Sequence, residues 1–400
     1  MLRTILFNSI HTLFQQIMRS FNKLILIVLT SSAFITLHAQ EKLHIQDKNR
    51  EIPETRPFQI LFYNTENLFD TQHDSLKNDY EFLPGQGRYW SYGRYKKKLQ
   101  NIGKAIIATG GWLPPALVGL AEVENEKVLI YLTRYSLLKE ANYRYVHHES
   151  PDERGIDVAL LYQPSQFRLL SDSAYRIRFP DSIAHKPTRD MLHVSGRIIS
   201  GDTLDVFVVH LPSRSGGELQ SRPARVFAAQ CMKQWIDSIM SCRTSPQIIV
   251  MGDFNDSPVS ASVIDGLQAQ SPSRIDSIGV NSKTLYNLML PIYEISKKKR
   301  KQEQGIYGTY KWQGEWEIID QFLVNDALLQ KENADQSKCK GLYFPTQKAE
   351  IVQHDFLLEP DLKEFGVRPF RTYYGYKYQG GFSDHLPITI RGVIFLHDSK

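Results

Sequence analysis

The stretch QIIVMGDFND, residues Gln247–Asp256, joins an uninterrupted apolar run to a group of acidic and amide side chains. A short apolar run that is bounded by turn residues is typical of a strand buried in a sheet. In open α/β sheets, the loops that follow such strands form the crevice in which ligands bind. The stretch therefore predicts an α/β fold, and it makes Asp253 and Asn255 candidate site residues.

The same arrangement of an apolar strand next to a polar side chain recurs along the chain. Asn64 ends the strand-like run FQILFYN, Glu122 follows ALVGLA, and His210 ends LDVFVVH. Asp384 and His385 directly precede the last apolar run, LPITIRGVIF. A single residue of this kind is more typical of a turn or a helix cap. Because the placement recurs, we expect these side chains to converge on one site.

The rest of the chain fits a single α/β domain over residues 57–396. Helical spacing of apolar residues predicts helices over 95–109, 126–141 and 223–240, and further strands are expected over 156–162, 192–200 and 317–324. Stretches near 271–305 and 331–378 lack clear patterning and are interpreted as loop insertions. The first contains the basic run Lys297–Lys301, which we interpret as a solvated loop, with a nucleic-acid contact as the alternative.

The first 39 residues have the features of a secretory signal peptide. Arg19 and Lys23 precede the uncharged apolar run Leu24–Leu37, and the small residue Ala39 closes it. Met18 is an alternative translation start. The run is short for a membrane span, which needs about 20 residues, so an uncleaved anchor is the secondary interpretation. We expect a periplasmic or extracellular protein, with a polar lead-in over residues 40–56.

Charge and cysteine content limit the class of partner. The formal net charge is +5, and it falls to +2 without residues 1–39, which hold three basic and no acidic residues. A global basic field of the kind that marks a dedicated nucleic-acid binder is therefore missing, although a local patch is compatible with this balance. The three cysteines, Cys231, Cys242 and Cys339, argue against a disulfide framework. No protein partner is implied, and we expect a monomer.

The candidate side chains fit attack of water on phosphorus with help from a metal ion. A hard cation such as Mg²⁺ prefers carboxylate oxygen, and charge on the phosphoryl oxygens needs the metal and cationic donors. The chain contains no GxxxxGK[ST], GxSxG or HExxH motif. Nucleotide-loop enzymes, serine hydrolases and zinc proteases of those types therefore have no support.

Seven motifs occur in order: NTENLFD (Asn64–Asp70), AEVEN (Ala121–Asn125), RGIDVALLY (Arg154–Tyr162), HLPSR (His210–Arg214), GDFND (Gly252–Asp256), IDQFLV (Ile319–Val324) and SDHLP (Ser383–Pro387). In sequence and order they resemble the motifs of the endonuclease/exonuclease/phosphatase superfamily. The resemblance spans Phe58 to about Ile394. It implies a deoxyribonuclease-like four-layer sandwich, in which helices flank two packed β-sheets.

The resemblance also implies roles for the central residues. Glu122 would be the principal metal ligand, with Asn64 at the metal and the phosphate and Asp384 assisting the metal. The ion would be Mg²⁺, with Mn²⁺ or Ca²⁺ as alternatives. Asp253 would orient and deprotonate the attacking water. Asn255 would fix Asp253 and contact phosphate. His385 would bind the phosphate or pass a proton, and Asp320 would hold the imidazole of His385.

Two further residues match one branch of the superfamily, and a third is interpreted beside them. His210 corresponds to a second histidine of deoxyribonuclease-like members and is the expected general acid, because histidine titrates near neutral pH. Arg189, in TRDML, is a looser match to a phosphate-binding arginine. Asp157 is interpreted as an orienting partner of His210, with a polar residue on a solvated strand face as the alternative.

The sequence leaves the substrate open between two hydrolase hypotheses. The first is a secreted or periplasmic nuclease that cleaves phosphodiester bonds, as the two histidines, export and the basic run suggest. The second is a phosphatase or phospholipid phosphodiesterase that acts on inositol phosphates or sphingomyelin-like substrates, which the near-neutral mature charge favours. A binding module without catalysis is disfavoured, because all the expected catalytic residues are present.

Overall fold

The computed structural model describes Met18 and residues 54–183, 185–275, 283–298, 305–329 and 341–396. The expected signal peptide and nearly all of the lead-in lie outside the described residues, as do Cys339 and residues 299–301 of the basic run. The chain divides into two units, Met1–Pro53 and Glu54–Lys400. The second unit contains all the strands discussed below.

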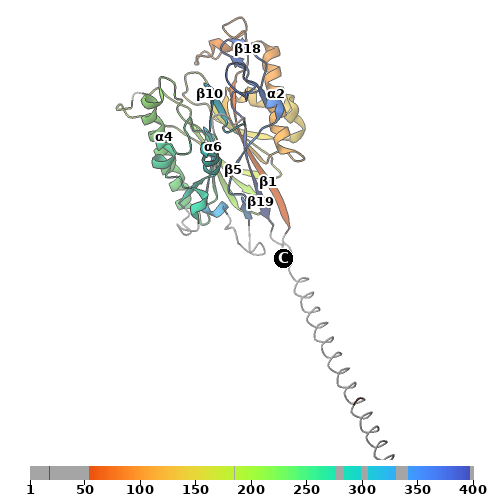
Figure 1. Ribbon diagram of the computed structural model, residues 1–400, viewed down its shortest axis with the longest axis vertical. Coiled ribbons are helices and arrows are strands. Elements are labelled where there is room, and N and C mark those ends of the chain that lie inside the picture. The colour runs from red at the N-terminus through yellow and green to blue at the C-terminus, as the bar shows by residue number, and fades with distance from the viewer. Residues whose placement is uncertain are drawn as a thin grey trace, which may run out of the picture. The chain divides into compact units, whose positions relative to one another are not determined.

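Two β-sheets form the centre of this unit (Figure 1). The first has the order β13-β19-β1-β2-β4-β3, and β14 also pairs with β19. Its strands are β1 (Thr55–Leu68), β2 (Leu117–Val123), β3 (Arg144–His147), β4 (Asp157–Tyr162), β13 (Gly341–Tyr343), β14 (Glu350–Ile351) and β19 (Ile388–Phe395). The second has the order β5-β6-β7-β8-β12-β9. Its strands are β5 (Phe167–Tyr175), β6 (Met191–Ile198), β7 (Thr203–His210), β8 (Ile248–Asp253), β9 (Leu285–Asn287) and β12 (Asp320–Asn325).

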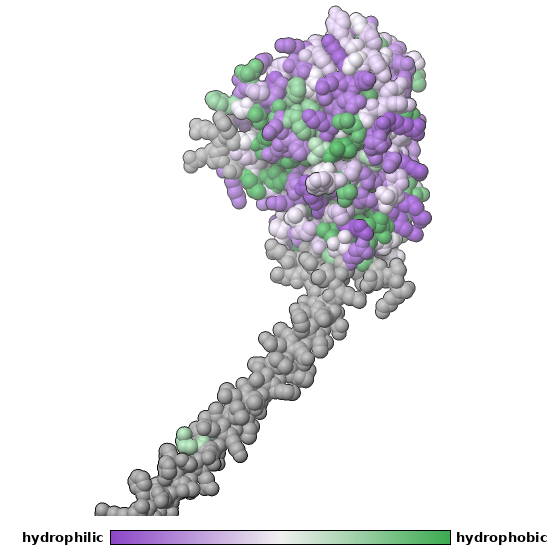
Figure 2. All heavy atoms as spheres, turned by 90° about the vertical axis from the view of Figure 1, so that its right-hand side faces the viewer, coloured by the Kyte–Doolittle hydropathy of each residue, from purple (hydrophilic) through white to green (hydrophobic). Residues whose placement is uncertain are grey.

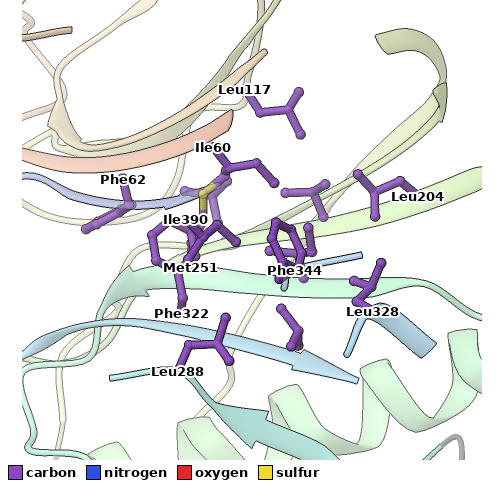
Figure 3. Packing of buried hydrophobic residues seen from close by; sticks show 14 of the residues in the cluster. Ile60, Phe62, Leu117, Leu204, Met251, Leu288, Phe322, Leu328, Phe344 and Ile390 are labelled. Atoms are coloured by element: carbon purple, nitrogen blue, oxygen red, sulfur yellow. The ribbon is translucent and has the colours of Figure 1, made fainter. Parts of the chain in front are cut away.

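The sheets pack face to face because their central strands are apolar on both faces. Successive side chains of a strand point to opposite faces of the sheet. In β1, Ile60 and Phe62 enter the core between the sheets, whereas Leu61 and Tyr63 face the helices on the other side. Met251 of β8 meets Phe322 and Ile390 in the same inter-sheet core (Figure 3). The apolar runs of the sequence are thus strands buried on both faces.

Helices cover the outer face of each sheet, and Figure 1 shows α2 and α4 on opposite sides of the pair. Helix α2 (Tyr92–Gly110) and helix α3 (Glu126–Tyr135) pack on the first sheet, and α4 (Glu218–Cys242) packs on the second. Helix α2 begins at the N-cap Ser91, whose side chain accepts a hydrogen bond from the backbone N–H of Arg94. The arrangement is the expected four-layer α/β sandwich.

Some element boundaries differ from the sequence expectations. Helix α4 begins at Glu218, so Pro223 lies inside the helix rather than near its start. The helix expected over 126–141 ends at Tyr135 and is followed by the 3₁₀ turn Leu137–Ala141. The stretch near 271–305 is more than a loop, because it supplies β9 and helix α6 (Leu290–Lys298). Strand β9 pairs with β12, and a three-residue strand is too short to show a period of two in sequence.

The stretch 331–378 also carries ordered elements in its described part. Besides β13 and β14, it contains the short hairpins β15 (Leu358–Pro360) with β16 (Val367–Pro369), and β17 (Tyr373–Tyr374) with β18 (Lys377–Tyr378). A further hairpin, β10 (Tyr310–Trp312) with β11 (Glu315–Glu317), precedes β12. Smaller 3₁₀ or π turns cover Tyr80–Phe82, Ser262–Gly266, Pro272–Arg274, Asp326–Leu328 and Asp355–Leu357.

The surface and the described helices add two observations. On the face seen in Figure 2, hydrophobic residues are interspersed with hydrophilic ones. Among the described residues, no helix has both the length and the apolar character that a membrane crossing requires. The described cysteines, Cys231 and Cys242, are free; Cys231 is half-buried rather than a core residue, because Ala228 and Met232 occupy the inner face of α4.

Candidate active site

Strand register brings the predicted residues together at one edge of the two sheets. Strands β7 and β8 are parallel, with His210 opposite Asp253. Strand β12 runs antiparallel to β8 and places Asp320 opposite Asp253. In the first sheet, Asn64 of β1 lies opposite Ala121, the residue before Glu122. The carboxyl ends of two parallel strand pairs therefore converge, as the sequence pattern predicts.

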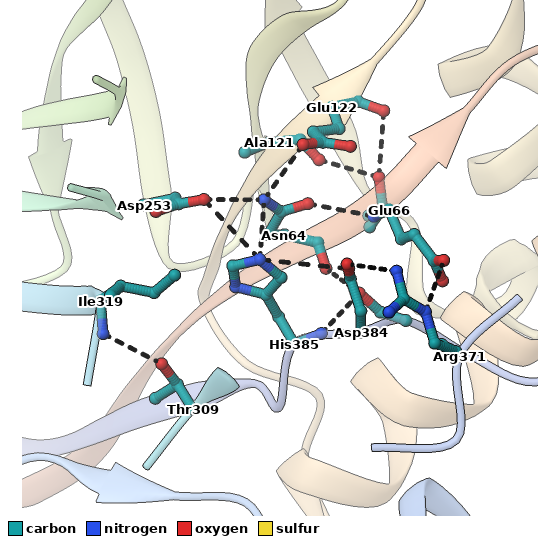
Figure 4. Close-up of polar contacts among 12 residues, drawn as sticks. Asn64, Glu66, Ala121, Glu122, Asp253, Thr309, Ile319, Arg371, Asp384 and His385 are labelled. Carbon is teal, nitrogen blue, oxygen red and sulfur yellow. Dashed lines mark hydrogen bonds and ion pairs between the residues drawn. The ribbon is translucent and has the colours of Figure 1, made fainter. Parts of the chain in front are cut away.

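The carboxylate of Asp253 is at the centre of the group (Figure 4). Its Oδ2 accepts a hydrogen bond from Nδ2 of Asn64 at 3.0 Å, and its Oδ1 accepts one from the backbone N–H of Asn255 at 2.8 Å. Nε2 of His210 and Nε2 of His385 lie 3.6 Å and 3.8 Å from Oδ2. Burial raises the pKa of Asp253 to about 7. A carboxylate with this pKa can act as a general base near neutral pH.

His385 is held in a charged pair with Asp320. Its Nδ1 lies 2.8 Å from Oδ2 of Asp320, and its backbone N–H donates to Oγ of Ser383. Burial alone would lower the pKa of His385, but Asp320, Asp253 and Asp384 raise it to about 10. The imidazole is therefore a cation at pH 7, as a group that binds phosphate needs to be.

His210 is in the opposite protonation state. It is buried, its Nδ1 has no hydrogen-bond partner, and burial together with Arg189 and Arg154 places its pKa well below the usual value. Among the described residues, no hydrogen bond or ion pair joins it to Asp157, whose partners are His147 and the backbone N–H of Ser150. The structure thus assigns Asp157 to a different cluster from the one expected.

Arg189 lies beside the histidine but is engaged by the protein. Its Nη1 donates to Oδ2 of Asp152 at 3.1 Å, and its Nη2 donates to the carbonyl of Leu211, the residue after His210, at 2.6 Å. Burial lowers its pKa. The same Leu211 carbonyl accepts a hydrogen bond from Nδ2 of Asn255. Arg189 and Asn255 therefore fix the loop after β7, and the Nε of Arg189 is left without a partner.

Glu122, the expected principal metal ligand, lies near the end of β2. It is half-buried, with φ of +63°, a left-handed conformation that is uncommon for residues other than glycine. Its Oε2 accepts the backbone N–H of Asn67 at 2.8 Å, and its Oε1 lies 3.5 Å from Nδ2 of Asn64. Because the Oδ1 of Asn64 accepts the backbone N–H of Glu66, this amide acts as a donor to carboxylates in the present orientation.

Asp384 belongs to a buried ionic network that the sequence analysis missed. Its Oδ2 pairs with Nη2 of Arg371 at 2.8 Å, and Nε of Arg371 lies 3.4 Å from Oε1 of Glu66. Nζ of Lys98 lies 3.9 Å from Oε2 of Glu66. Although burial raises the pKa of Asp384, Arg371 and His385 outweigh it, and the net shift is downward. An ionised carboxylate is the form of Asp384 that a cation site requires.

Sequence signals for these missed residues did exist. Glu66 lies within the NTENLFD motif, between Asn64 and the strand end. Lys98 interrupts an otherwise apolar helix face formed by Tyr95, Leu99 and Ile102, and a charged residue at such a position calls for a buried partner. Arg371 carried no comparable signal, because it is 305 residues from Glu66.

Solved structures similar to this chain include an endonuclease/exonuclease/phosphatase family protein from Bacteroides thetaiotaomicron, which is 14% identical with a TM-score of 0.48 and covers 86% of this chain and 96% of its own. The human Nocturnin catalytic domain with bound sulfate is 16% identical, with a TM-score of 0.46 and coverages of 86% and 98%. A humanized D. rerio TDP2 is 12% identical, with a TM-score of 0.47 and coverages of 84% and 98%.

Among curated proteins, none matches this chain. A family model described as the endonuclease/exonuclease/phosphatase family matches residues 59–393. That match covers both sheets and every residue of the candidate site, from Asn64 to His385. The chain therefore belongs to the endonuclease/exonuclease/phosphatase family, and it is a phosphoester hydrolase.

Proposed function

We propose that this chain is an exported nuclease that hydrolyses phosphodiester bonds of DNA or RNA with a divalent cation, Mg²⁺ in the first instance. The observation that carries the proposal is the pair of histidines beside Asp253. A cationic His385 and a neutral His210 each place Nε2 within 3.8 Å of the same carboxylate oxygen. The cationic histidine suits the non-bridging phosphoryl oxygens, on which negative charge develops. The other histidine suits the oxygen of the leaving group, which needs a proton.

The residues present fit a hard cation. Glu122 and Asp384 supply carboxylate oxygens, and Glu122 is half-exposed, so that a cation can reach it. When bound, the cation would neutralise charge that develops on the phosphoryl oxygens. A second donor group, Asp253, Asp320 and His385, has ligand atoms within 4.8 Å of one another. We assign that group to proton transfer and phosphate binding, because Nδ1 of His385 is already engaged by Asp320.

The side chains then have distinct tasks. Asp253, held by Asn64 and the backbone N–H of Asn255, orients a water molecule and accepts its proton. His385 donates a hydrogen bond from Nε2 to a phosphate oxygen, and Asp320 keeps its ring fixed. His210 is neutral in the free protein, and the negative charge of a bound phosphate raises its pKa toward the range of a general acid.

A cavity lined by sequence neighbours of these residues supports a nucleic-acid substrate. It has a volume of about 590 Å³, within the usual range of ligand pockets, and its lining includes Ile319, next to Asp320, and Asp256, next to Asn255. Its lining also includes four aromatic side chains, three cationic ones and four acidic ones, namely Tyr293, Tyr307, Trp316, Phe365, Arg214, Lys297, Lys311, Glu218, Asp256, Glu315 and Glu317. Aromatic faces stack on bases, so the aromatic part of this lining suits a base next to the scissile bond.

The alternative is a phosphatase or phospholipid phosphodiesterase, which the net charge of +2 without residues 1–39 favours. A salt titration separates the two. Binding of a polyanion weakens steeply as salt rises, whereas hydrolysis of inositol phosphates or sphingomyelin depends on salt much less.

The direct test is hydrolysis by the purified protein of plasmid DNA, RNA, inositol phosphates and sphingomyelin, each with Mg²⁺ and with EDTA. Cleavage of nucleic acid that EDTA abolishes is the expected result. Hydrolysis of the small or lipid substrates alone would replace the nuclease proposal with the alternative.

Export is proposed from residues 1–39 alone. Cell fractionation with mass spectrometry of the chain's N-terminus tests it, with Gln40 expected as the first residue. A full-length chain retained in the cytoplasm would overturn export without touching the enzymatic proposal.

A further inference from the structure

The hairpin formed by β3 and β4 gathers three potential metal ligands outside the proposed catalytic centre. His147 is the last residue of β3, Asp157 is the first of β4, and Glu149 lies in the loop between them. One ligand atom of each lies within 4.8 Å of the others. His147 is opposite Ala159, so Asp157 is its diagonal neighbour on the same face of the antiparallel pair. Strand register therefore holds the imidazole and the carboxylate together.

Two buried polar atoms of this cluster lack a hydrogen-bond partner. The side chains of His147 and Asp157 are only 4% and 2% exposed, and Nε2 of His147 lies 3.3 Å from Oδ2 of Asp157. Neither atom makes a hydrogen bond. The other oxygen of Asp157 accepts the backbone N–H of Ser150 at 3.1 Å, which fixes the direction of Oδ2. A buried carboxylate oxygen without a donor is costly, and a cation would satisfy both atoms at once.

We propose that His147, Glu149 and Asp157 form a second divalent-cation site, which prefers Zn²⁺ or Mn²⁺ to Mg²⁺. An imidazole nitrogen with two carboxylates is a donor set that suits these metals, whereas Mg²⁺ prefers oxygen ligands alone. Glu149 is exposed and provides the route of entry from solvent. The ligand oxygens of Glu149 and Asp157 lie within 4.8 Å of one another, and a cation would relieve the repulsion between these carboxylates.

The site would stabilise a loop that reaches the catalytic centre. Asp157 is paired with Val123, at the point where the β2–β4 ladder shifts register around Glu122. The same loop carries Asp152, which holds Arg189 beside His210. Nζ of Lys77 also donates to the backbone carbonyls of Ser150 and Asp152, at 2.6 Å and 3.1 Å. The proposed site shares no ligand with the Glu122 site, so the two can be tested separately.

The test is the stoichiometry of Zn²⁺ and Mn²⁺ bound to the untagged protein, measured by equilibrium dialysis with elemental mass spectrometry. Glu122→Gln removes the proposed catalytic ligand, and the part of the remaining binding that the hairpin changes abolish reports the hairpin site. We expect this variant to bind one Zn²⁺. Adding His147→Asn and Glu149→Gln should weaken that binding more than about 100-fold, since loss of an outer-shell partner alone costs 10- to 100-fold.

The matched control is His148→Asn, the adjacent histidine, which is partly exposed and pairs with Asp172 at 2.7 Å. It should leave Zn²⁺ binding unchanged. Glu149→Gln alone, at an exposed position, keeps the test valid if the double change impairs folding, and it should weaken binding at least about tenfold. Anomalous diffraction at the zinc edge should place the ion between His147 and Asp157. No bound Zn²⁺ in Glu122→Gln, or equal binding after the hairpin changes, would overturn the proposal.

Discussion

His385 and Asp320 form a buried charged pair, with Nδ1 and Oδ2 2.8 Å apart, and the pair lies directly beside Asp253. Asp320 keeps the imidazole both oriented and protonated, which raises the pKa of His385 to about 10. A second buried histidine–aspartate pair, His193 with Asp205 at 2.9 Å, lies within the second sheet. The two pairs allow a catalytic role to be separated from a structural one.

Asp320→Asn should lower kcat on the preferred substrate by about 10²–10⁴-fold, the usual contribution of a positioned acid or base. The amide keeps the shape of the side chain but cannot stabilise an imidazolium. Steady-state kinetics with Mg²⁺ across pH 5–9 measure the effect, and circular dichroism confirms the fold. A kcat within a few fold of wild type would contradict the role of the pair.

Asp205→Asn should instead lower stability and leave kcat of the folded enzyme unchanged. Burial alone would raise the pKa of Asp205, but hydrogen bonds from Arg243 and His193 lower it to about 2. A depressed carboxyl pKa stabilises the folded state above the unfolded pKa, and that contribution is lost as the pH falls from about 4 to about 2. The loss is about 2 kcal/mol at pH 7. Urea unfolding at pH 7 and pH 3 tests this prediction. The difference in free energy of unfolding between the variant and the wild type should be smaller at pH 3.

How much the sequence could predict depended on whether a residue's partner was local. Asp253 and His210 end apolar strands, and parallel register alone brings such ends together. The pairing of Glu66 with Arg371 could not be predicted in this way, because it depends on a loop closure across 305 residues. Short strands such as β9 were missed because three residues give no detectable period, and their pairing comes from the tertiary fold. The strand that contains Asp157 was predicted. Its partner His147 lies in β3, the first strand of the same hairpin, and β3 was not predicted.

Asp253→Asn should abolish turnover while it preserves or raises thermal stability. Burial raises the pKa of Asp253 to about 7, so above that pH the folded state carries the cost of an ionised buried carboxylate. The amide removes this cost together with the base that activates water. The measurements are the melting temperature at pH 8 and kcat, each compared between the variant and the wild type on the same preparations. Wild-type turnover in this variant would refute the assignment of Asp253 as the base.

Trp316→Ala should raise KM for a polynucleotide more than for a small phosphodiester such as bis-p-nitrophenyl phosphate. Trp316 lines the cavity that sequence neighbours of the catalytic residues also line, and stacking on one base is worth about 1–3 kcal/mol, or about 5- to 150-fold in KM. Trp312 provides the matched control, because it lies in the same β10–β11 hairpin, is 56% exposed and does not line the cavity. Trp312→Ala should leave both KM values unchanged. An equal rise for both substrates in Trp316→Ala would mean that the cavity binds no base, and a polynucleotide KM unaffected by either change would place the nucleic acid elsewhere on the surface.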